Sequence, residues 1–210
     1  MISIIRRMLF LQTISDYKKI DGWLTENEAV GLYSIARKLP IGSIVVEIGS
    51  WQGKSTYCLS KGLKSGKLYA IDPFNKDAGA DVETQKDYNN KVTQNSLLTS
   101  FEKNMIDLKV FQKIIVKNGY SYNFHDDFDE IDFLFIDGDH SIDGCKLDYN
   151  LYAHKIKKGG YIALHDYYPD RLDLGPTYVI NEMVLKSDDF TFYKIFDSLW
   201  VGKKVSRNDI

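Results

Sequence analysis

The sequence predicts an α/β fold: a seven-stranded, mostly parallel sheet with helices on both faces, whose last strands form an antiparallel hairpin. Five short apolar runs alternate with segments of helical periodicity, which is the pattern of repeated β-then-α units. Two further runs, 190–196 and 198–201, follow each other without a helix between them and indicate a hairpin around Asp197-Ser198. At 210 residues the chain is long enough for one domain with a full core. We therefore expect a single domain over residues 1–210.

The first 40 residues predict a helical extension ahead of the first strand. Residues 1–15 are apolar but interrupted by two arginines, and they lack the order of a secretory signal. We expect an amphipathic helix that covers the domain or contacts a second copy of the chain, which would make a homo-oligomer through this region. Thr25, with Glu28 three residues later, has the capping-box pattern for a second helix that ends near Leu39.

The stretch 43–72 carries the strongest signal. Its apolar run at 44–48 predicts a strand buried on both faces, and Gly49 permits a sharp turn close to a ligand. Gly53 starts a helix over 54–64, closed by a glycine, and a second strand then ends in Asp72. An acid about twenty residues past such a turn is placed to accept hydrogen bonds from both hydroxyls of a ribose.

The later elements follow the same alternation. They are a polar loop at 73–95, a helix at 96–107, a strand at 113–116, a turn at 118–121 in which Ser121 would cap a short helix, a strand at 131–136, a helix at 142–156, a strand at 161–164 after a Gly159-Gly160 turn, a helix at 175–186, the hairpin, and a frayed tail at 203–210. The long loop leaves the strand that ends in Asp72, so it would hang over the ligand site as a lid or remain a loop without catalytic duty.

Polar residues gather where the predicted parallel strands end. The residues at these carboxyl ends are Gly49, Asp72, Gly119, Asp137 and His165-Asp166. Ligands of open α/β sheets bind outside the carboxyl ends of the strands. We therefore expect these carboxylates and the imidazole to meet at one rim.

The glycine turn differs from two common nucleotide motifs. Trp51 stands where a dinucleotide fingerprint has its second glycine, which leaves little room for a pyrophosphate. Lys54-Ser55 lacks the preceding spacing of a phosphate-binding loop. A net charge of −2 excludes a global basic field for nucleic acid, and no run has the length of a membrane span. Cys58 and Cys145 indicate buried free thiols, so we expect a cytoplasmic protein.

Three strings resemble a known family. Glu47-Ile48-Gly49-Ser50-Trp51-Gln52-Gly53-Lys54-Ser55-Thr56, Ile136-Asp137-Gly138-Asp139-His140-Ser141 and Gly159-Gly160-Tyr161-Ile162-Ala163-Leu164-His165-Asp166-Tyr167 are similar to class I S-adenosylmethionine-dependent methyltransferases, in the branch of cephalosporin-hydroxylase-like and macrocin O-methyltransferase-like proteins. The resemblance covers nearly the whole chain and implies the Rossmann-like methyltransferase fold. It implies S-adenosylmethionine as cofactor, bound by Glu47, Gly49, Ser50, Trp51, Gly53, Asp72, Gly119, Ser121 and Asp137. The acceptor would be a hydroxyl of a small molecule or glycan.

Relatives in this branch often hold a divalent cation on the rim, and the matching positions here are Asp137, His165 and Asp166. The relatives supply oxygen donors suited to Mg²⁺. Imidazole at position 165 instead suits Zn²⁺, Mn²⁺ or Fe²⁺, so either the metal preference is altered or no metal binds and His165 is an acid or base. His140 matches the position of the base in the catechol enzymes, although it could merely cap the next helix.

Other readings remain open from the sequence alone. Asp137, His140 and His165 are the expected catalytic residues, whereas His125 and His154 are expected to be structural or exposed. The side chains expected to wall an acceptor pocket are those of Trp51, Tyr167 and Tyr168. A cofactor-binding protein without turnover and a nucleotide-dependent oxidoreductase are the competing functions.

Overall fold

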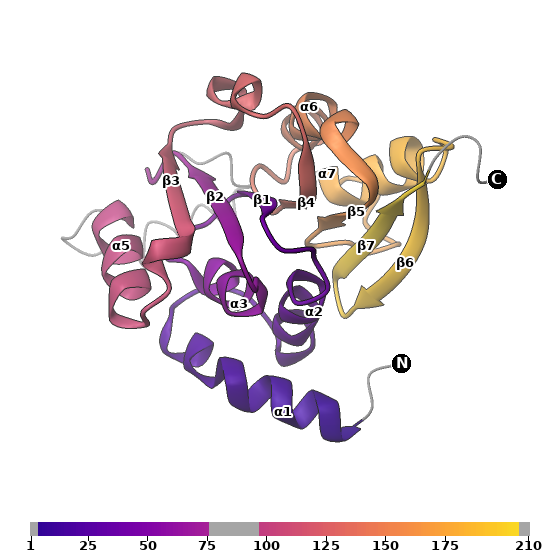
Figure 1. Ribbon diagram of the computed structural model, residues 1–210. Helices are drawn as coiled ribbons and strands as arrows, with labels where there is room; N and C mark the ends of the chain where they lie inside the picture. Colours follow the sequence, from indigo (N-terminus) through magenta and orange to yellow (C-terminus); the bar gives the residue numbers. More distant parts are fainter. Residues whose placement is uncertain (1–3, 76–96, 206–210) are drawn as a thin grey trace.

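The structure, a computed structural model, describes residues 4–75 and 97–205. Its centre is a seven-stranded sheet in the order β3-β2-β1-β4-β5-β7-β6. Strands β1 to β5 are parallel, and β7 is inserted antiparallel between β5 and β6 (Figure 1). The strands are β1 (Ser43–Ile48), β2 (Gly66–Asp72), β3 (Ile114–Asn118), β4 (Ile131–Ile136), β5 (Ile156–Leu164), β6 (Phe190–Phe196) and β7 (Leu199–Lys204). The predicted fold class is confirmed.

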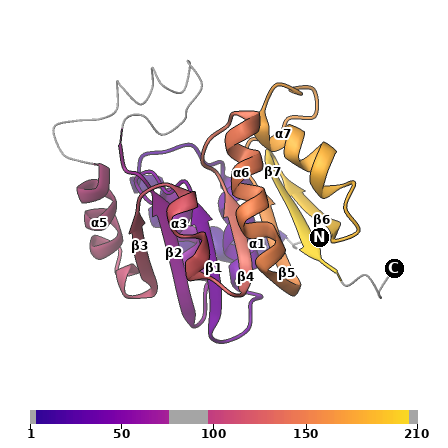
Figure 2. The same cartoon turned by 90° about the horizontal axis from the view of Figure 1, so that it is seen from above.

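Helices cover both faces of this sheet. Helices α1, α2 and α3 lie on one face, and α6 and α7 lie on the other, in front of the sheet in Figure 2. The helices are α1 (Ile4–Ile14), α2 (Glu26–Ala36), α3 (Lys54–Gly62), α5 (Leu97–Asp107), α6 (Ile142–Tyr152) and α7 (Gly175–Val179), which continues as a π-helical turn over Ile180–Val184. Single 3₁₀ turns lie at Ser15–Lys19, Phe111–Lys113, Ser121–Asn123, His125–Asp127 and Ala153–Lys155.

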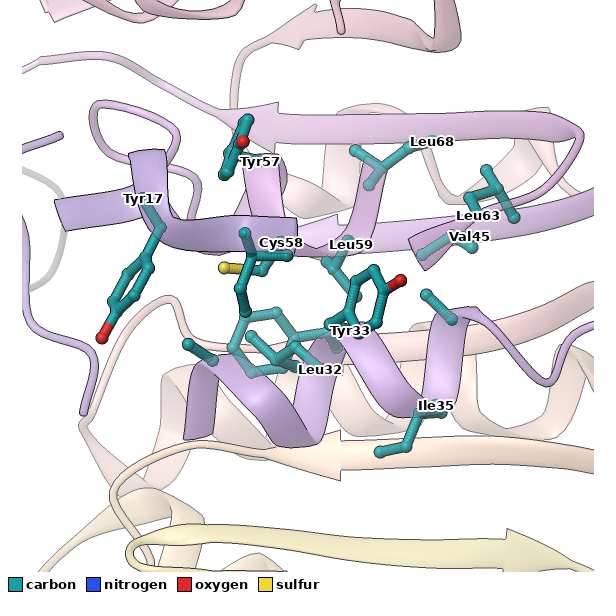
Figure 3. Close-up of a cluster of buried hydrophobic side chains, with 14 of the residues drawn as sticks. Tyr17, Leu32, Tyr33, Ile35, Val45, Tyr57, Cys58, Leu59, Leu63 and Leu68 are labelled. Carbon is teal, nitrogen blue, oxygen red and sulfur yellow. The ribbon is translucent and has the colours of Figure 1, made fainter. Parts of the chain in front are cut away.

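Each face of the sheet has its own apolar core. On the first face, α2 packs against α3 and the sheet through Leu32, Tyr33 and Leu59, which are nearly inaccessible to solvent (Figure 3). Gly31 of α2 permits this close packing, because an added Cβ would lie 2.8 Å from the ring of Phe196 on β6. The second core forms between the sheet and the α6–α7 layer. Helix α2 is therefore held on several sides, which fixes where its N-terminus meets the sheet.

Helix α1 is apolar on two faces. Phe10 and Ile14 are buried against the domain, as expected for a covering helix. Ile4, Ile5, Met8 and Leu9 are exposed. Association with a second copy through this region stays a prediction. Within residues 4–75 and 97–205, no helix combines the length and apolarity needed to cross a membrane.

Several element boundaries differ from the predictions. Helix α3 ends at Gly62, and Gly66 begins β2 instead of closing the helix. Helix α6 ends at Tyr152, so β5 begins earlier than predicted and contains Gly159-Gly160 within an irregular pairing to β4. Strand β7 extends to Lys204 and pairs with both neighbours, which removes residues 203 and 204 from the predicted tail. The predicted loop lies mostly outside the described residues.

Strand register places the predicted rim residues in a row. Ile48 is paired with Ile71 on β2 and with Ile136 on β4, and Ile136 is paired with Leu164 on β5. The residue that follows each of these four is, across the sheet, Asp72, Gly49, Asp137 and His165. Adjacent strands lie about 4.8 Å apart, so neighbours in this row are within side-chain reach.

Candidate active site

A cavity of about 770 Å³ opens at the carboxyl ends of the parallel strands. The predicted site residues on its lining are Gly49, Ser50, Trp51, Asp72, Gly119, Ser121, Asp137, His140, His165 and Asp166. The structure thus brings together ten residues that the sequence placed at separate strand ends. Glu47 and Gly53, the other two predicted cofactor residues, are not among the residues that line it.

The turn after β1 requires glycine at its first position. Gly49 has φ +87°, and an added Cβ would lie 2.0 Å from the carbonyl oxygen of Asp137. Trp51 has φ +48°, an uncommon value for a bulky residue. Such backbone strain persists only where surrounding contacts hold it. Here the contact is Asp72, whose Oδ2 accepts hydrogen bonds from the backbone N–H groups of Ser50 and Trp51 at 2.8 and 2.9 Å.

Asp72 consequently has a structural role in addition to the predicted ligand role. Its Oδ1 accepts a third hydrogen bond, of 2.6 Å, from the N–H of Phe74, which also has a positive φ. Burial raises the pKa of Asp72, while the three backbone donors oppose that shift. Because Oδ2 already accepts two bonds, the remaining capacity for a ribose hydroxyl lies mainly on Oδ1.

Glu47 stabilises the same turn through buried hydrogen bonds. It is fully buried and accepts hydrogen bonds from the hydroxyls of Ser50 (2.9 Å), Ser55 (2.6 Å) and Thr56. Burial raises the pKa of Glu47 to about 7, even though these three hydroxyls favour the charged form. The acid therefore ties the end of β1 to the first turn of α3.

An acid–imidazole cluster lies at the ends of β4 and β5. His140 Nε2 lies 3.7 Å from Asp137 Oδ1 and 3.3 Å from Asp166 Oδ2. His165 Nδ1 lies 3.3 and 3.2 Å from the same two oxygens. Asp166 has φ +57°, so the backbone is strained where its carboxylate joins the cluster. The two imidazoles thus approach one pair of carboxylates from two sides.

The charges of this cluster shift its pKa values together. Burial alone would lower the pKa of both histidines, but Asp137 and Asp166 outweigh burial, so the pKa of His140 is raised and that of His165 is raised well above the ordinary value. Burial would raise the pKa of Asp137, but the two imidazoles lower it. Asp137 and the two imidazoles therefore stabilise each other's charged forms.

A residue that the sequence did not assign to the site reaches it from α2. Glu28 Oε2 lies 3.3 Å from His165 Nε2, close enough for an ion pair although the two are not aligned as a hydrogen bond. The other oxygen, Oε1, accepts hydrogen bonds from the N–H and hydroxyl of Ser198 at 3.0 and 2.7 Å. The predicted capping box of Thr25 and Glu28 is confirmed, and it orients this carboxylate. The capping pattern was visible in the sequence, but the contact of Glu28 with His165, just past the end of β5, was not.

The geometry changes which histidine is free to bind a cation. The nitrogens of His165 face carboxylates on both sides of its ring, and the residue is 5% exposed. By contrast, one ligand atom each from Asp137, His140 and Asp166 lie within 4.8 Å of one another at the cavity surface. Two carboxylates and one imidazole form a donor set that fits Mn²⁺ or Zn²⁺ better than Mg²⁺. His140 thus replaces His165 as the nitrogen donor of the candidate set.

Other sequence expectations for single residues have mixed outcomes. Ser141, not His140, caps α6 by accepting a bond of 3.1 Å from the N–H of Gly144. Ser121 does not cap the short helix; its hydroxyl donates to Asp148 of α6. Tyr168 lines the cavity with Trp51, whereas Tyr167 packs into the second core.

Two further groups on the cavity lining were missed by the sequence analysis. Trp23 lies beside Trp51 with ring centroids 5.7 Å apart. Asp148 is a buried carboxylate, and the signal for it was its spacing from Cys145 and Tyr152, which places it on the buried face of α6. Of the remaining histidines, His125 and His154 make contacts to nearby backbone carbonyls, at 3.0 and 3.2 Å.

Known proteins share this architecture. An uncharacterized protein of Acanthamoeba polyphaga mimivirus is 29% identical over 152 residues, which are 71% of this chain but only 63% of the viral protein. The O-methyltransferase TomG of Streptomyces achromogenes, involved in tomaymycin synthesis and solved with S-adenosylmethionine, has a TM-score of 0.64 at 16% identity, covering 95% of this chain and 89% of TomG. An O-methyltransferase of Bacillus cereus, solved with S-adenosylhomocysteine, has a TM-score of 0.63 at 13% identity, covering 95% and 90%.

At these identities the solved structures show the fold. A family profile described as a methyltransferase domain matches residues 46–167, which run from within β1 past the end of β5 and include the whole acid–imidazole cluster. Because this match spans more than half of the chain, the protein belongs to that family of methyltransferase domains.

Proposed function

We propose that the protein transfers the methyl group of S-adenosylmethionine to a hydroxyl oxygen of a small molecule or sugar. The observation that carries the proposal is the row of strand ends. It places Asp72, suited to a ribose, in the same cavity as the cluster of Asp137, His140 and Asp166, suited to a hydroxyl. TomG and the Bacillus cereus protein, which have the same fold, support S-adenosylmethionine as cofactor and oxygen as acceptor.

The turn after β1 favours this cofactor over a dinucleotide. Trp51 stands on the cavity lining in place of a second glycine, and its backbone is held by Asp72. An indole at this point takes the space that a pyrophosphate would need beside the helix N-terminus. A nicotinamide-dependent oxidoreductase is therefore the weaker reading of the site.

The chemistry needs an oxygen nucleophile that is held in line with the methyl group and then loses its proton. His140 is placed to take that proton, because its Nε2 faces the cavity beside Asp137 and Asp166. The same two carboxylates raise its pKa, so its neutral form becomes available above the ordinary histidine value. A divalent cation bound by Asp137, Asp166 and His140 would instead lower the pKa of the acceptor hydroxyl, and His140 would then be a ligand of the cation and not the base.

Calorimetry tests the cofactor without knowledge of the acceptor. We expect S-adenosylhomocysteine to bind and NAD⁺ to show no heat of binding at the same concentration. Tight binding of NAD⁺ without binding of S-adenosylhomocysteine would contradict the proposal.

The cation is tested separately by manganese titration followed by electron paramagnetic resonance. We expect about one Mn²⁺ per chain, as in related single-metal catalytic sites. The double variant Asp137→Asn, Asp166→Asn should lose this binding, and Asp143→Asn, which changes an exposed acid of α6, should keep it. Unchanged Mn²⁺ affinity in the double variant would place any bound ion elsewhere.

A further inference from the structure

The cavity lies at the carboxyl ends of the parallel strands, and the amino ends of three of these strands form a surface rich in lysine. Strands β1, β2 and β3 are parallel neighbours, so the segments that lead into them, 37–43, 61–67 and 109–113, meet at one edge of the sheet. None of these segments contains an acid. We call this surface the basic edge, and its cations are Arg37, Lys38, Lys61, Lys64, Lys67, Lys109 and Lys113.

Hydrogen bonds of the basic edge leave its positive charge in place. Lys113 Nζ donates to the carbonyl oxygens of Ser60 and Leu63 at 2.9 and 2.5 Å, and Lys67 Nζ donates to another carbonyl oxygen at 3.3 Å. A neutral carbonyl accepts from an ammonium group without cancelling its charge. Burial and, to a smaller extent, the charge of Lys61 lower the pKa of Lys113, which shows that the cations lie close enough to repel one another.

Acids beside the basic edge have cations of their own. Glu130 and Asp132, at the start of β4, lie 3.7 and 3.3 Å from Nζ of Lys157 on β5. Asp107, the last residue of α5, pairs with Lys103 one turn earlier in the same helix. The basic edge therefore keeps a local excess of positive charge, although the net charge of the whole chain is −2.

The basic edge also exposes apolar side chains. Ile41, in the turn before β1, is 82% exposed, and Ile106, in the last turn of α5, is 57% exposed. Phe111, the aromatic residue of the three segments, is instead partly buried against the first core. Single-stranded nucleic acid is bound by cationic grooves with aromatic side chains on which bases stack. Basic residues around exposed aliphatic side chains fit an anionic membrane surface better, because the aliphatic groups enter the headgroup region.

We propose that the basic edge docks the protein on the surface of an anionic lipid bilayer, with Ile41 among the headgroups and the surrounding lysines against the lipid anions. The cavity, at the opposite ends of the same strands, then faces away from the bilayer. This inference goes beyond the proposed methyl transfer and does not rest on it.

Cosedimentation with vesicles tests the charge of the basic edge. We expect binding to phosphatidylcholine vesicles that contain about 30% phosphatidylserine, weaker binding when salt is raised above about 0.1 M, and no binding to phosphatidylcholine alone. Each basic residue near such a surface contributes roughly fivefold in affinity, so the double variant Lys64→Gln, Lys67→Gln should bind about 30-fold more weakly. The control Lys19→Gln, Lys186→Gln removes the same charge from exposed positions elsewhere and should stay within about threefold of the wild type.

The apolar contribution is tested at the same vesicles. Ile41→Ser should weaken binding roughly tenfold, because the side chain no longer buries apolar area. Leu172→Ser changes an exposed leucine of the loop after β5, at the carboxyl edge, and should bind as the wild type does. Both side chains are exposed, so neither variant should lower the melting midpoint.

Weaker binding in the Lys64/Lys67 and Ile41 variants, with both controls unchanged, supports the inference. It is overturned if the wild type does not bind phosphatidylserine vesicles, if the lysine control loses as much affinity as the double variant, or if Ile41→Ser binds as the wild type does. Tighter binding of a short single-stranded RNA than of the vesicles would also overturn it, by assigning the edge to nucleic acid. None of these results alters the calorimetric test of the cofactor.

Discussion

Replacing Glu28 by glutamine removes the charge that α2 places against His165. The carboxylate is 2% exposed, lies 3.3 Å from His165 Nε2, and accepts hydrogen bonds from Ser198 and from the N–H of Thr25 at 2.8 Å. Burial would raise the pKa of Glu28, but His165 and these donors lower it from 4.5 to about 2. The glutamine keeps the shape and leaves His165 with two carboxylates on its other side.

The expected cost follows from linkage. The folded-state pKa is depressed by 4.5 − 2, or about 2.5 units, and each unit is worth about 1.36 kcal/mol, so the charge contributes roughly 3 kcal/mol at neutral pH. This agrees with the range of about 3–5 kcal/mol for breaking a buried ion pair. A loss of this size lowers the melting midpoint of a domain this large by roughly 6–12 °C.

The sign of the pH dependence gives a sharper test. Because the pKa is depressed, the contribution of Glu28 is present above about pH 4.5 and is lost as the pH falls toward 2. Urea unfolding of wild type and Glu28→Gln should therefore differ most at pH 6–7 and converge in acid. Glu26→Gln, in the same helix, removes an exposed ion pair with Lys18 and should change the free energy of unfolding far less than Glu28→Gln does at pH 7. A difference below about 1 kcal/mol at pH 7, or one that persists unchanged at pH 3, would show that the Glu28 charge does not stabilise the fold through a lowered pKa.

Three further predictions concern the turn and the cluster. Burial raises the folded-state pKa of Glu47 to about 7, so the free energy of unfolding should fall as the pH rises from about 4.5 to 7. In Glu47→Gln, denaturant unfolding between pH 5 and 8 should show a smaller fall than in the wild type. An equal fall in both proteins would contradict the prediction. Gly49→Ala and Gly159→Ala both place alanine at a positive φ, but only the Cβ at position 49 meets backbone, at 2.0 Å. Gly159→Ala should therefore lower the free energy of unfolding by about 1–2 kcal/mol, and Gly49→Ala by considerably more. Similar losses in the two variants would show that the turn after β1 can open. His140→Ala should keep the affinity for S-adenosylhomocysteine within a few fold while turnover falls roughly 10²–10⁴-fold. In the wild type the turnover rate should rise with pH at a point above pH 6.5, and the variant should lose this rise. A variant that keeps the rise would assign the base to another residue.

Much of this protein was determined by local patterns in the sequence. The apolar run of β1, the glycine at position 49 and the capping box at Thr25 each depend on neighbours within a few residues, so their structure follows from periodicity and backbone sterics. The polar residues at the strand ends could also be predicted, because parallel β-α units bring the carboxyl ends of their strands to one edge of the sheet in any strand order.

Other features depended on strand order and register, which no local pattern specifies. The pairing of Ile136 with Ile48 and Leu164 sets Asp137 beside Gly49 and His165, and a shift of one residue would have turned each side chain to the opposite face. The ends of β3 and the buried face of α6 meet only in the folded chain, so Ser121 appeared to be a helix cap until Asp148 lay against it.

The assignment of the two histidines shows the same division. From the sequence, His165 was the expected cation ligand, because it occupies the matching position at the end of β5. In the folded chain Glu28 lies against its Nε2, since Ser198 in the β6–β7 turn and the packing of α2 on the sheet hold that carboxylate there. Glu28 and His165 are far apart in sequence, and their contact exists only because a helix that precedes the sheet and a hairpin that ends it close around one strand end. The sequence determined which groups are available, and the tertiary structure decided which of them face one another.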